Sequence, residues 1–595
     1  MFWKKTKIYS LLKLFNEGFA GYRGQIFLIA VLGLFGGLLE GVGINAVIPM
    51  FSFVSGGGQG DDLISRFIRE FFNFFDLSFN LRYLLIFVVS LFVARAIFLF
   101  WCNFIRIKIS ADYEESARNN LFSRTLKADW PYLMKQKLGY LETISAINIQ
   151  YAGLLLQYLS SAIMTLGALI MYVAVAVNIS LTITSLTLVF GAVLILFFMP
   201  LVKKSRLISR EKEKFNKQAA HFINENITGL KTIKAMLVDD QVIKRAKAYF
   251  AELKELVIRT SFLRIVADSL IQPIGLIFVC VIFAISYKMS NFNFAVLAAV
   301  IYLIQRMFTY VQQLQSNIHT VGETIPYLRG ILDYQNEVVK NLEVDRGKND
   351  FKFGDSLEFK DVSFSYGQAE SILDKLSFKI KRGEMVGLIG PSGAGKTTLV
   401  DLILRLFKPQ AGEISLDGKN IESISLRDWR RHIGYVSQDI FLKNDTLEQN
   451  IRFYDKNISD SQIKKAAVAA NSVDFIAECP DGWQTIVGER GIRFSAGQRQ
   501  RLIIARVLAR QPELLILDEA TSALDNESEE QIQQVMENLK GKLTAFIIAH
   551  RLSTVKNVDR LLVLADGKII EQGRPQDLLA DKKSYFHKVY NLKNN

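Results

Sequence analysis

The chain has 595 residues, of which 50% are hydrophobic, and its mean hydropathy is +0.20. This length is more than one hydrophobic core supports, and this hydropathy is high for a soluble protein, so the composition predicts two domains and a large apolar part. The 72 lysines and arginines exceed the 58 aspartates and glutamates, and the resulting net charge of +14 is also typical of nucleic-acid-binding proteins. The three cysteines lie far apart and the five histidines do not cluster, so we expect neither a disulfide framework nor a metal cluster.

The first half of the chain contains six long apolar segments. They span roughly residues 25–54, 82–109, 151–177, 181–201, 265–287 and 294–318. Each approaches or exceeds the ~20 residues that a helix needs to cross ~30 Å of hydrocarbon. Buried helices of a soluble protein would account for any one segment, but not for six of this length. The sequence therefore predicts six transmembrane helices, with the third and fourth joined by a tight hairpin at Asn178.

The basic residues follow the predicted membrane topology. They crowd into residues 203–259 and 106–137 and the start of the chain, whereas the outer loops 55–81, 178–180 and 288–293 are poor in them. This positive-inside asymmetry places both termini and both long loops in the cytoplasm, and it explains the charge without nucleic acid. The amphipathic start of the chain is more typical of an interfacial helix than of a cleavable signal peptide.

Residues 390–398 have the sequence Gly-Pro-Ser-Gly-Ala-Gly-Lys-Thr-Thr, between the apolar run Met385–Ile389 and the periodic stretch Leu399–Leu406. A glycine-rich loop between a strand and a helix is the context of a phosphate-binding loop, where backbone N–H groups and the helix N-terminus bind phosphate. Lys396 would reach the β- and γ-phosphates, and the Thr397 hydroxyl would bind Mg²⁺. The predicted phosphate-binding residues are Gly390, Pro391, Ser392, Gly393, Ala394, Gly395, Lys396, Thr397 and Thr398.

A second apolar run, Leu514–Leu517, ends in Asp518 and Glu519. Four consecutive apolar residues are typical of a central parallel strand that is buried on both faces, and ligands bind at the carboxyl ends of such strands. We therefore expect Asp518 to contribute to Mg²⁺ binding and Glu519 to polarise the water that attacks the γ-phosphate. If this segment were the one motif of its kind in the chain, a strand that ends in a solvated acidic turn would explain it equally well.

Further motifs, in the same order, make residues from about 356 to 595 resemble the nucleotide-binding domain of an ABC transporter. Ser495-Ala496-Gly497-Gln498 resembles the signature motif, Arg490 lies in what resembles the X-loop, and Ser522-Ala523-Leu524-Asp525 resembles the D-loop. The resemblance implies ATP and Mg²⁺ as ligands, and phosphate contacts for Ser495, Gly497 and Gln498. It also implies that Tyr366 stacks on adenine, that Gln438 binds Mg²⁺ and assists catalysis, and that His550 is catalytic beside Glu519.

The signature segment opens a long predicted helix that runs through Leu508. In the family, this helix N-terminus lies far from the phosphate-binding loop of its own chain and acts on the nucleotide of a second chain, so the resemblance implies a homodimer. Two positions depart from the family pattern, with Ala496 where glycine is usual and Phe494 where leucine is usual. We interpret the methyl group of Ala496 as tolerated, because Ser495, Gly497 and Gln498 are intact.

The order of the two halves resembles a bacterial half-exporter of the type IV fold. The implied fold is a membrane all-α domain of six transmembrane helices followed by a cytoplasmic α/β P-loop ATPase domain. The expected bounds are 1–330 for the membrane domain, 331–355 for a linker and 356–595 for the ATPase domain. Trp130–Leu138 and Ile227–Leu237 are the expected coupling helices. The resemblance implies a multi-pass protein of the cell (inner, cytoplasmic) membrane that binds no nucleic acid.

Three features indicate what is transported. Residues Glu40–Phe51 resemble the first helix of lipid-linked oligosaccharide and polysaccharide flippases. Apolar residues recur at helical spacing between Leu63 and Phe75, which predicts an amphipathic helix either at the outer membrane face or against neighbouring segments. Arginines occur in or near membrane segments, where each costs ~2.5–3.5 kcal/mol on insertion. These are Arg95, Arg264 and Arg306.

The membrane arginines have two explanations. They pair with Glu40 and Asp268, or they line a cavity and bind an anionic group such as pyrophosphate, which arginine binds in bidentate fashion. We favour the cavity, and hence an ATP-driven flippase of a lipid-linked, pyrophosphate-bearing oligosaccharide. An exporter of lipids, peptides or hydrophobic drugs is the alternative. An ATP-gated membrane regulator without transport is an alternative of another class.

Overall fold

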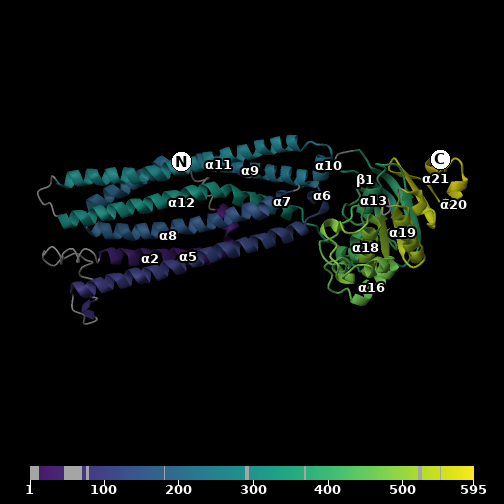
Figure 1. Cartoon of the computed structure of the whole chain (residues 1–595), viewed down its shortest axis with the longest axis horizontal. Coiled ribbons are helices and arrows are strands. Elements are labelled where there is room, and N and C mark those ends of the chain that lie inside the picture. The colour runs from purple at the N-terminus through teal and green to yellow at the C-terminus, as the bar shows by residue number, and fades with distance from the viewer. Residues whose placement is uncertain are drawn as a thin grey trace. The chain divides into compact units, whose positions relative to one another are not determined.

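The computed structural model describes residues 13–45, 70, 72–74, 80–137, 139–179, 181–287, 294–367, 370–519, 525–549 and 551–594. By its internal contacts the chain divides into two units. Unit 1 comprises Met1–Ala128 and Tyr132–Leu342, and unit 2 comprises Asp129–Pro131 and Glu343–Asn595. Figure 1 labels helices of both units and the strand β1.

Several predicted features fall outside the described residues. They are most of the outer helix between Leu63 and Phe75, Leu138, Ser522–Leu524 of the D-loop and His550. The side chain of Glu40 is not described either. The roles assigned to these residues stay predictions.

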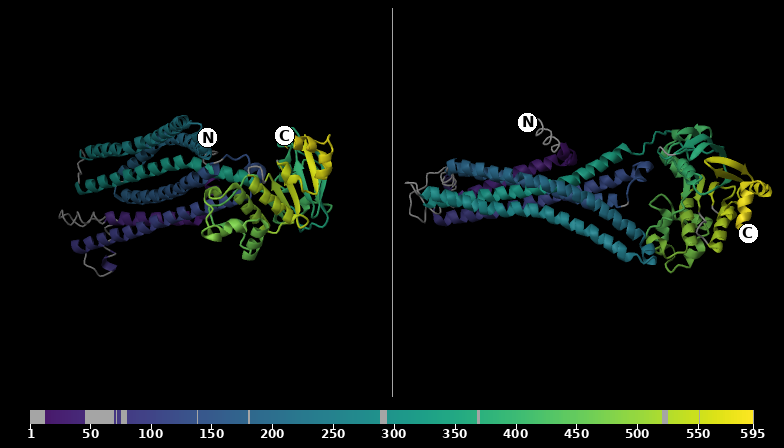
Figure 2. Two further views of the ribbon diagram at one scale, coloured as in Figure 1. Left: turned by 45° about the vertical axis from the view of Figure 1, so that its right-hand side comes forward. Right: turned by 90° about the horizontal axis from the view of Figure 1, so that it is seen from above.

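Unit 1 is built from long helices. They are α2 (Arg23–Asn45), α5 (Leu81–Leu126), α8 (Ile149–Ile179), α9 (Leu181–Thr228), α11 (Asp239–Tyr287) and α12 (Phe294–Lys340). These helices run side by side, with α8 packed against α2 and α12, and α9 packed against α11 and α12 (Figures 1 and 2). Glycine permits the closest contacts. A Cβ on Gly33 of α2 would lie 2.8 Å from the Cα of Met164 on α8.

Within the described residues, four helical stretches are long and apolar enough to cross a membrane. They are Leu81–Leu126, Tyr140–Ala174, Leu181–Thr228 and Asp239–Ala284, beside a shorter apolar helix at Ala20–Gly36. Large apolar side chains on their outer faces are exposed, as lipid-facing side chains are, among them Phe100, Phe197 and Leu276. A total of six crossings stays a prediction.

The two predicted coupling helices are shorter than expected. Helix α6 spans Trp130–Leu133 rather than Trp130–Leu138, and Pro131 lies in its first turn, where a missing N–H is tolerated. Helix α10 spans only Leu230–Ala235, because α9 continues to Thr228.

Two other boundaries differ from the expectation. Asn178 lies inside α8, which ends at Ile179, and α9 begins at Leu181. Helix α12 continues to Lys340 and includes the first part of the segment expected as a linker.

Before α8, the short helix α7 (Tyr140–Thr143) continues directly into the π-helical turn η2 (Ile144–Asn148). Turns of this wider kind commonly mark bends in helices.

Unit 2 has two β-sheets with helices packed around them. The four-stranded antiparallel sheet has the order β2-β1-β4-β5, and the six-stranded sheet has the order β10-β9-β3-β8-β7-β6 with parallel pairing from β9 to β6. The strands are β1 (Ser356–Phe364), β2 (Leu373–Lys381), β3 (Met385–Ile389), β4 (Ala411–Leu416), β5 (Lys419–Asn420), β6 (Ile433–Val436), β7 (Leu514–Asp518), β8 (Thr544–Ile548), β9 (Arg560–Ala565) and β10 (Lys568–Gly573). The helices are α13 (Lys396–Ile403), α14 (Leu426–His432), α15 (Leu447–Arg452), α16 (Asp460–Ala469), α17 (Val473–Ala477), α18 (Ala496–Ala509), α19 (Asn526–Leu539), α20 (Pro575–Ala580) and α21 (Tyr585–Asn594).

The inner strands of the six-stranded sheet are buried on both faces. Every residue of β3, β7 and β8 is buried. Alternate residues join two separate hydrophobic clusters, with Leu515 and Leu517 in one and Leu514 and Ile516 in the other. Because β8 pairs in parallel with both β3 and β7, the carboxyl ends of all three strands meet at one edge. That edge brings the glycine-rich loop and Asp518 together.

Candidate active site

The glycine-rich loop after β3 curls around the side chain of Lys396, the first residue of α13. The Nζ atom of Lys396 donates to the carbonyl oxygen of Gly390 at 3.0 Å and to that of Pro391 at 2.9 Å. Gly393 and Gly395 have φ angles of +82° and +101°, which residues with a Cβ rarely adopt. A Cβ at Gly390 would lie 2.0 Å from a carbonyl oxygen of β9. This loop conformation therefore requires glycine at these three positions.

Two carboxylates approach this ammonium group from the end of β7. Burial lowers the pKa of Lys396, while the negative charges of Glu519 and Asp518 oppose that shift. Burial, and then the charge of Glu519, raise the pKa of Asp518 to about 6, although Lys396 and a hydrogen bond from Tyr435 oppose the shift. A divalent cation beside the Asp518 carboxylate would favour its ionised form.

Glu519 and Gln438 are brought together from segments that follow β7 and β6. The Oε2 atom of Glu519 accepts a hydrogen bond from Nε2 of Gln438 at 2.7 Å. Glu519 has a φ angle of +50°, and its N–H donates to the carbonyl oxygen of Ile548 on β8 at 3.0 Å, which holds this unusual backbone in place. Non-glycine residues with positive φ are enriched at functional sites.

Tyr366 follows β1 and is held against α13. Its ring packs edge-on against Phe364 and Phe407, with centroid distances of 5.0 and 5.1 Å. Its hydroxyl oxygen lies 3.2 Å from Oγ1 of Thr398. Thr398 is therefore buried and occupied by a protein contact, whereas the neighbouring Thr397 is exposed. Of the two predicted threonines, Thr397 is the one whose hydroxyl is open to a ligand.

Two residues at this site were missed by reasoning from the sequence. Burial, and then the charge of Asp518, raise the pKa of Asp401 on α13 to about 6, against a hydrogen bond from Tyr366. Tyr435 on β6 donates to Asp518, and burial raises the pKa of its phenol. Tyr435 pairs with Ile516 of β7, so its proximity follows from strand pairing and leaves no local signal in the sequence.

The signature segment forms the N-terminus of α18. Oγ of Ser495 accepts from the N–H of Gln498 at 3.2 Å, and Oε1 of Gln498 accepts from the N–H of Ser495 at 2.9 Å, which is a reciprocal capping box. A Cβ at Gly497 would lie 2.2 Å from Oγ of Ser528 on α19. Ala496 instead packs against the hydrophobic core. Packing therefore requires glycine at Gly497 and accommodates the methyl group of Ala496.

The second departure in this motif also has a packing explanation. Phe494 packs against the same core, with its ring centroid 5.9 Å from that of Phe475. Arg490 lies in the 3-10 turn η5 (Glu489–Gly491) with a φ angle of +53°, and its carbonyl oxygen accepts from Nη1 of Arg499 at 3.4 Å. The larger ring at Phe494 is thus part of the fold of this segment.

The oxygen atoms at the edge of the sheet suit Mg²⁺, a hard cation that prefers oxygen ligands. They are the carboxylate of Asp518, the exposed hydroxyl of Thr397 and Oε1 of Gln438, which is left over when Nε2 donates to Glu519. Among the described residues, no group of three or more His, Cys, Asp and Glu could hold a metal alone. In the usual Mg²⁺ site, substrate phosphates and water complete the ligands.

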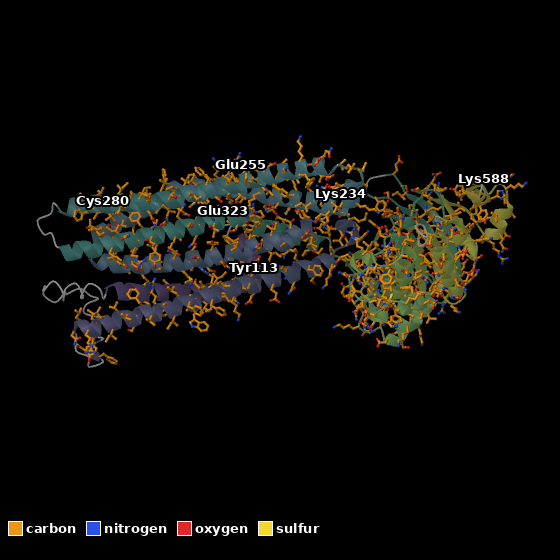
Figure 3. The ribbon with its side chains drawn as sticks, viewed as in Figure 1. Tyr113, Lys234, Glu255, Cys280, Glu323 and Lys588 are labelled. Atoms are coloured by element: carbon orange, nitrogen blue, oxygen red, sulfur yellow. The ribbon has the colours of Figure 1, made fainter. Side chains whose placement is uncertain are left out.

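The three membrane arginines lie on three helices of unit 1. Nη1 of Arg264 on α11 lies 3.9 Å from Oε2 of Glu323 on α12, the residue labelled near the middle of the bundle in Figure 3. Arg306 on α12 donates through Nε to the hydroxyl of Tyr302 at 3.0 Å and lies over that ring. Arg95 on α5 is half-buried. Arg264 thus has a carboxylate partner that the sequence did not suggest.

Comparisons with known proteins agree with this architecture. The family described as ABC transporter transmembrane region matches residues 26–313, and the family described as ABC transporter matches residues 373–522. The chain is 32% identical to an ATP-dependent lipid A-core flippase of Saccharophagus degradans over 524 residues, which cover 87% of this chain and 88% of the relative. It is 33% identical to the heterocyst differentiation ATP-binding protein HepA of Nostoc sp. over 497 residues, 79% of each chain.

A solved structure shares the fold. It is a bacterial Atm1-family ABC exporter with ATP bound, with a TM-score of 0.79 and 23% identity, covering 98% of this chain and 99% of that chain. The chain belongs to the ABC transporter family, as its motifs predicted. Within the family it is a fused half-exporter, with a helical transmembrane domain and an ATPase domain in one multi-pass chain, and it couples ATP hydrolysis to transport.

Proposed function

We propose that this chain is an ATP-driven flippase that moves a lipid-linked, pyrophosphate-bearing oligosaccharide across the cytoplasmic membrane. The observation that carries the proposal is the presence of two arginines on membrane helices, Arg95 on α5 and Arg306 on α12. A guanidinium in hydrocarbon persists where something offsets its desolvation, and a pyrophosphate group does so with bidentate contacts. The similarity to lipid A-core flippases supports an amphiphilic lipid substrate.

The arginine that least supports this proposal is Arg264. Its contact with Glu323 at 3.9 Å is a structural ion pair of the kind that the alternative explanation requires. We therefore assign the substrate contacts mainly to Arg95 and Arg306. Arg264 would help to hold α11 against α12, and it would meet the substrate only if the helices move.

The ATP site supplies the energy for this movement. In our proposal Lys396 and the loop bind the phosphates, Asp518, Thr397 and Gln438 hold Mg²⁺, and Glu519 polarises the attacking water. Glu519 accepts a hydrogen bond from Gln438, which orients its carboxylate. His550, Tyr366 and the signature residues keep the roles that the resemblance implies.

The proposed assembly is a homodimer in the inner membrane, with both ATPase domains in the cytoplasm. Each signature segment would act on the nucleotide of the other chain, through the N-terminus of α18. The proposed membrane domain has six crossings and spans residues 1–330, and the proposed ATPase domain spans residues 356–595. Positive-inside charge and the cytoplasmic supply of ATP support this orientation.

Two rival functions are separable by experiment. An exporter of lipids, peptides or hydrophobic drugs would be stimulated by apolar compounds, and an ATP-gated regulator would show no substrate-stimulated hydrolysis. The test is flipping and ATP hydrolysis by the purified protein in proteoliposomes, with a pyrophosphate-linked oligosaccharide lipid, its monophosphate analogue and a hydrophobic drug. The proposal requires flipping of the pyrophosphate lipid and its loss in the Arg95→Ala/Arg306→Ala variant. Normal flipping by that variant would refute it.

A further inference from the structure

Unit 1 contains a cavity of about 2600 Å³ that the ATP site does not use and that holds none of the three membrane arginines. Its walls come mainly from α9 and α12, with further residues from α10, α11 and the segment around Tyr140. The two helices that form most of the walls, α9 and α12, run parallel to each other. Gly191 of α9 faces Val311 of α12, Val202 faces Gly322, and Glu213 faces Gly330.

One wall carries a line of cations. Lys203, Arg206, Arg210, Lys214 and Lys217 line the cavity from α9. Their spacing of three or four residues places them on one face of the helix, one turn apart. Arg329 lines the cavity from α12, and it lies close enough to Arg206 for the two like charges to interact unfavourably.

Most of these charges are not neutralised by the protein. Nζ of Lys217 forms an ion pair with Oε1 of Glu213 at 2.6 Å. The other cations make no hydrogen bond or ion pair within the residues that the structure describes; they are Lys203, Arg206, Arg210, Lys214 and Arg329. Two carboxylates besides Glu213 line the cavity, Glu225 and Asp333. A cavity wall with unpaired, partly buried guanidinium groups is suited to an anion.

The other part of the cavity is apolar. Leu196, Met199 and Val202 precede the cations on α9, and Ile318, Val321 and Ile325 precede Arg329 on α12. Because the two helices run in parallel, the apolar stretches face each other at one end and the cationic stretches lie together at the other. The cavity therefore has the two-part character of an amphiphile with an apolar chain and an anionic head.

We infer that this cavity binds the phosphate-bearing head of a lipid amphiphile on the cytoplasmic side, before the lipid reaches the membrane arginines. Arg206, Arg210 and Arg329 contact the phosphate groups, because guanidinium matches phosphate geometry in bidentate fashion. The apolar residues of α9 and α12 contact the first part of the chain. The inference rests on the proposed function, and it adds a loading site separate from Arg95 and Arg306.

The test is binding to the purified full-length protein without nucleotide, in phosphatidylcholine nanodiscs. The probes are farnesyl pyrophosphate, farnesol and inorganic pyrophosphate, which carry both parts, the chain alone and the head alone. We expect farnesyl pyrophosphate to bind the wild type most tightly. The change Arg206→Gln, and separately Arg329→Gln, should weaken it roughly tenfold, as expected for the loss of a charge-assisted hydrogen bond.

Two variants guard against a folding artefact. Lys204 is exposed on α9 and does not line the cavity, so Lys204→Gln is the matched control and should bind like the wild type. Arg210 is exposed, so Arg210→Gln should weaken binding without a change in the thermal unfolding temperature. Equal affinity for inorganic pyrophosphate and farnesyl pyrophosphate would overturn the inference and leave a site for free anions. Unchanged binding in all three arginine variants would also overturn it, as expected if the partner chain covers the cavity.

The two proposals fail in different ways. If the wild type flips a pyrophosphate-linked lipid but the Arg206 and Arg329 variants bind and flip normally, only the loading site is wrong. If the wild type binds farnesyl pyrophosphate through these arginines but flips no pyrophosphate-linked lipid, the loading site stands and the proposed substrate is wrong.

Discussion

A buried ion pair in unit 1 allows a stability prediction. Oε1 of Glu213 on α9 accepts from Nζ of Lys217 at 2.6 Å and from Nδ2 of Asn148 in η2 at 2.9 Å. Nζ of Lys217 also donates to the hydroxyl of Tyr140 on α7 at 3.0 Å. Gly330 of α12 closes over the pair, because a Cβ there would lie 2.7 Å from Oε1 of Glu213. Four elements thus meet at one buried carboxylate.

The change Lys217→Met leaves the Glu213 carboxylate buried with one remaining donor. Removing one partner of a buried ion pair costs roughly 3–5 kcal/mol, and the donation from Asn148 favours the lower end of that range. A loss of about 3 kcal/mol corresponds to roughly 2–3 °C in unfolding temperature, because an unfolding entropy of ~2.1 cal/mol/K per residue gives about 0.8 °C per kcal/mol for a chain of this length. The double change Lys217→Met/Glu213→Gln removes both charges and keeps an amide that can accept from Asn148. It should recover at least half of the loss.

The assay is thermal unfolding of the purified protein in one detergent at one scan rate, because the unfolding of a membrane protein is commonly irreversible. Lys204→Met, at an exposed position of the same helix, is the control and should leave the unfolding temperature unchanged. A shift of less than about 1 °C for Lys217→Met would refute the energetic argument. So would a double variant that is less stable than the single one, because the two charges would then not be coupled.

Three further predictions concern ATP hydrolysis. Glu519→Gln should abolish phosphate release but retain ATP binding, and near-normal turnover would show that another group polarises the water. Ala496→Gly should change the hydrolysis rate by less than about threefold, because the methyl group packs on the core; complete loss of activity would contradict this. The pKa of Asp518 is raised to about 6, so hydrolysis should fall as the pH drops through 6, and excess Mg²⁺ should move that fall to lower pH. A pH profile that does not respond to Mg²⁺ would rule out this carboxylate as a ligand.

The sequence predicted the ATPase half in detail because its features are local. The run before Gly390 and the run before Asp518 have the composition of strands buried on both faces, and the structure has β3 and β7 at those positions. The glycines of the loop have positive φ angles or no room for a Cβ, so their spacing reflects a backbone requirement. The family that these motifs indicated is confirmed by the comparisons.

The sequence did not predict the contacts between segments that lie far apart in the chain. Tyr435 reaches Asp518 only because β6 pairs with β7, and Arg264 meets Glu323 only because α11 packs on α12. Each pair is separated by more than fifty residues, and neither carries a motif. Short helices lie within both ranges predicted for coupling helices, but they are shorter than predicted, since helix-forming residues after Leu133 and before Leu230 do not determine where a helix ends. Their coupling role stays a prediction.

The packing of α9 on α12 connects the buried ion pair with the cationic cavity. The contacts at Gly191, Val202 and Glu213 recur every eleven residues on α9, a period that keeps one face of a helix against its partner over six turns. Arg206 lies one turn after Val202 and Lys217 lies one turn after Glu213, so both cations flank the same line of contact. Glycine-mediated packing of α9 on α12 therefore brings the backbones that carry Arg206 and Arg329 close together, and their like charges interact unfavourably. Within the described residues, Lys217 is paired with Glu213, whereas Arg206 and Arg329 form no ion pair with a carboxylate, and a bound anion would offset their repulsion.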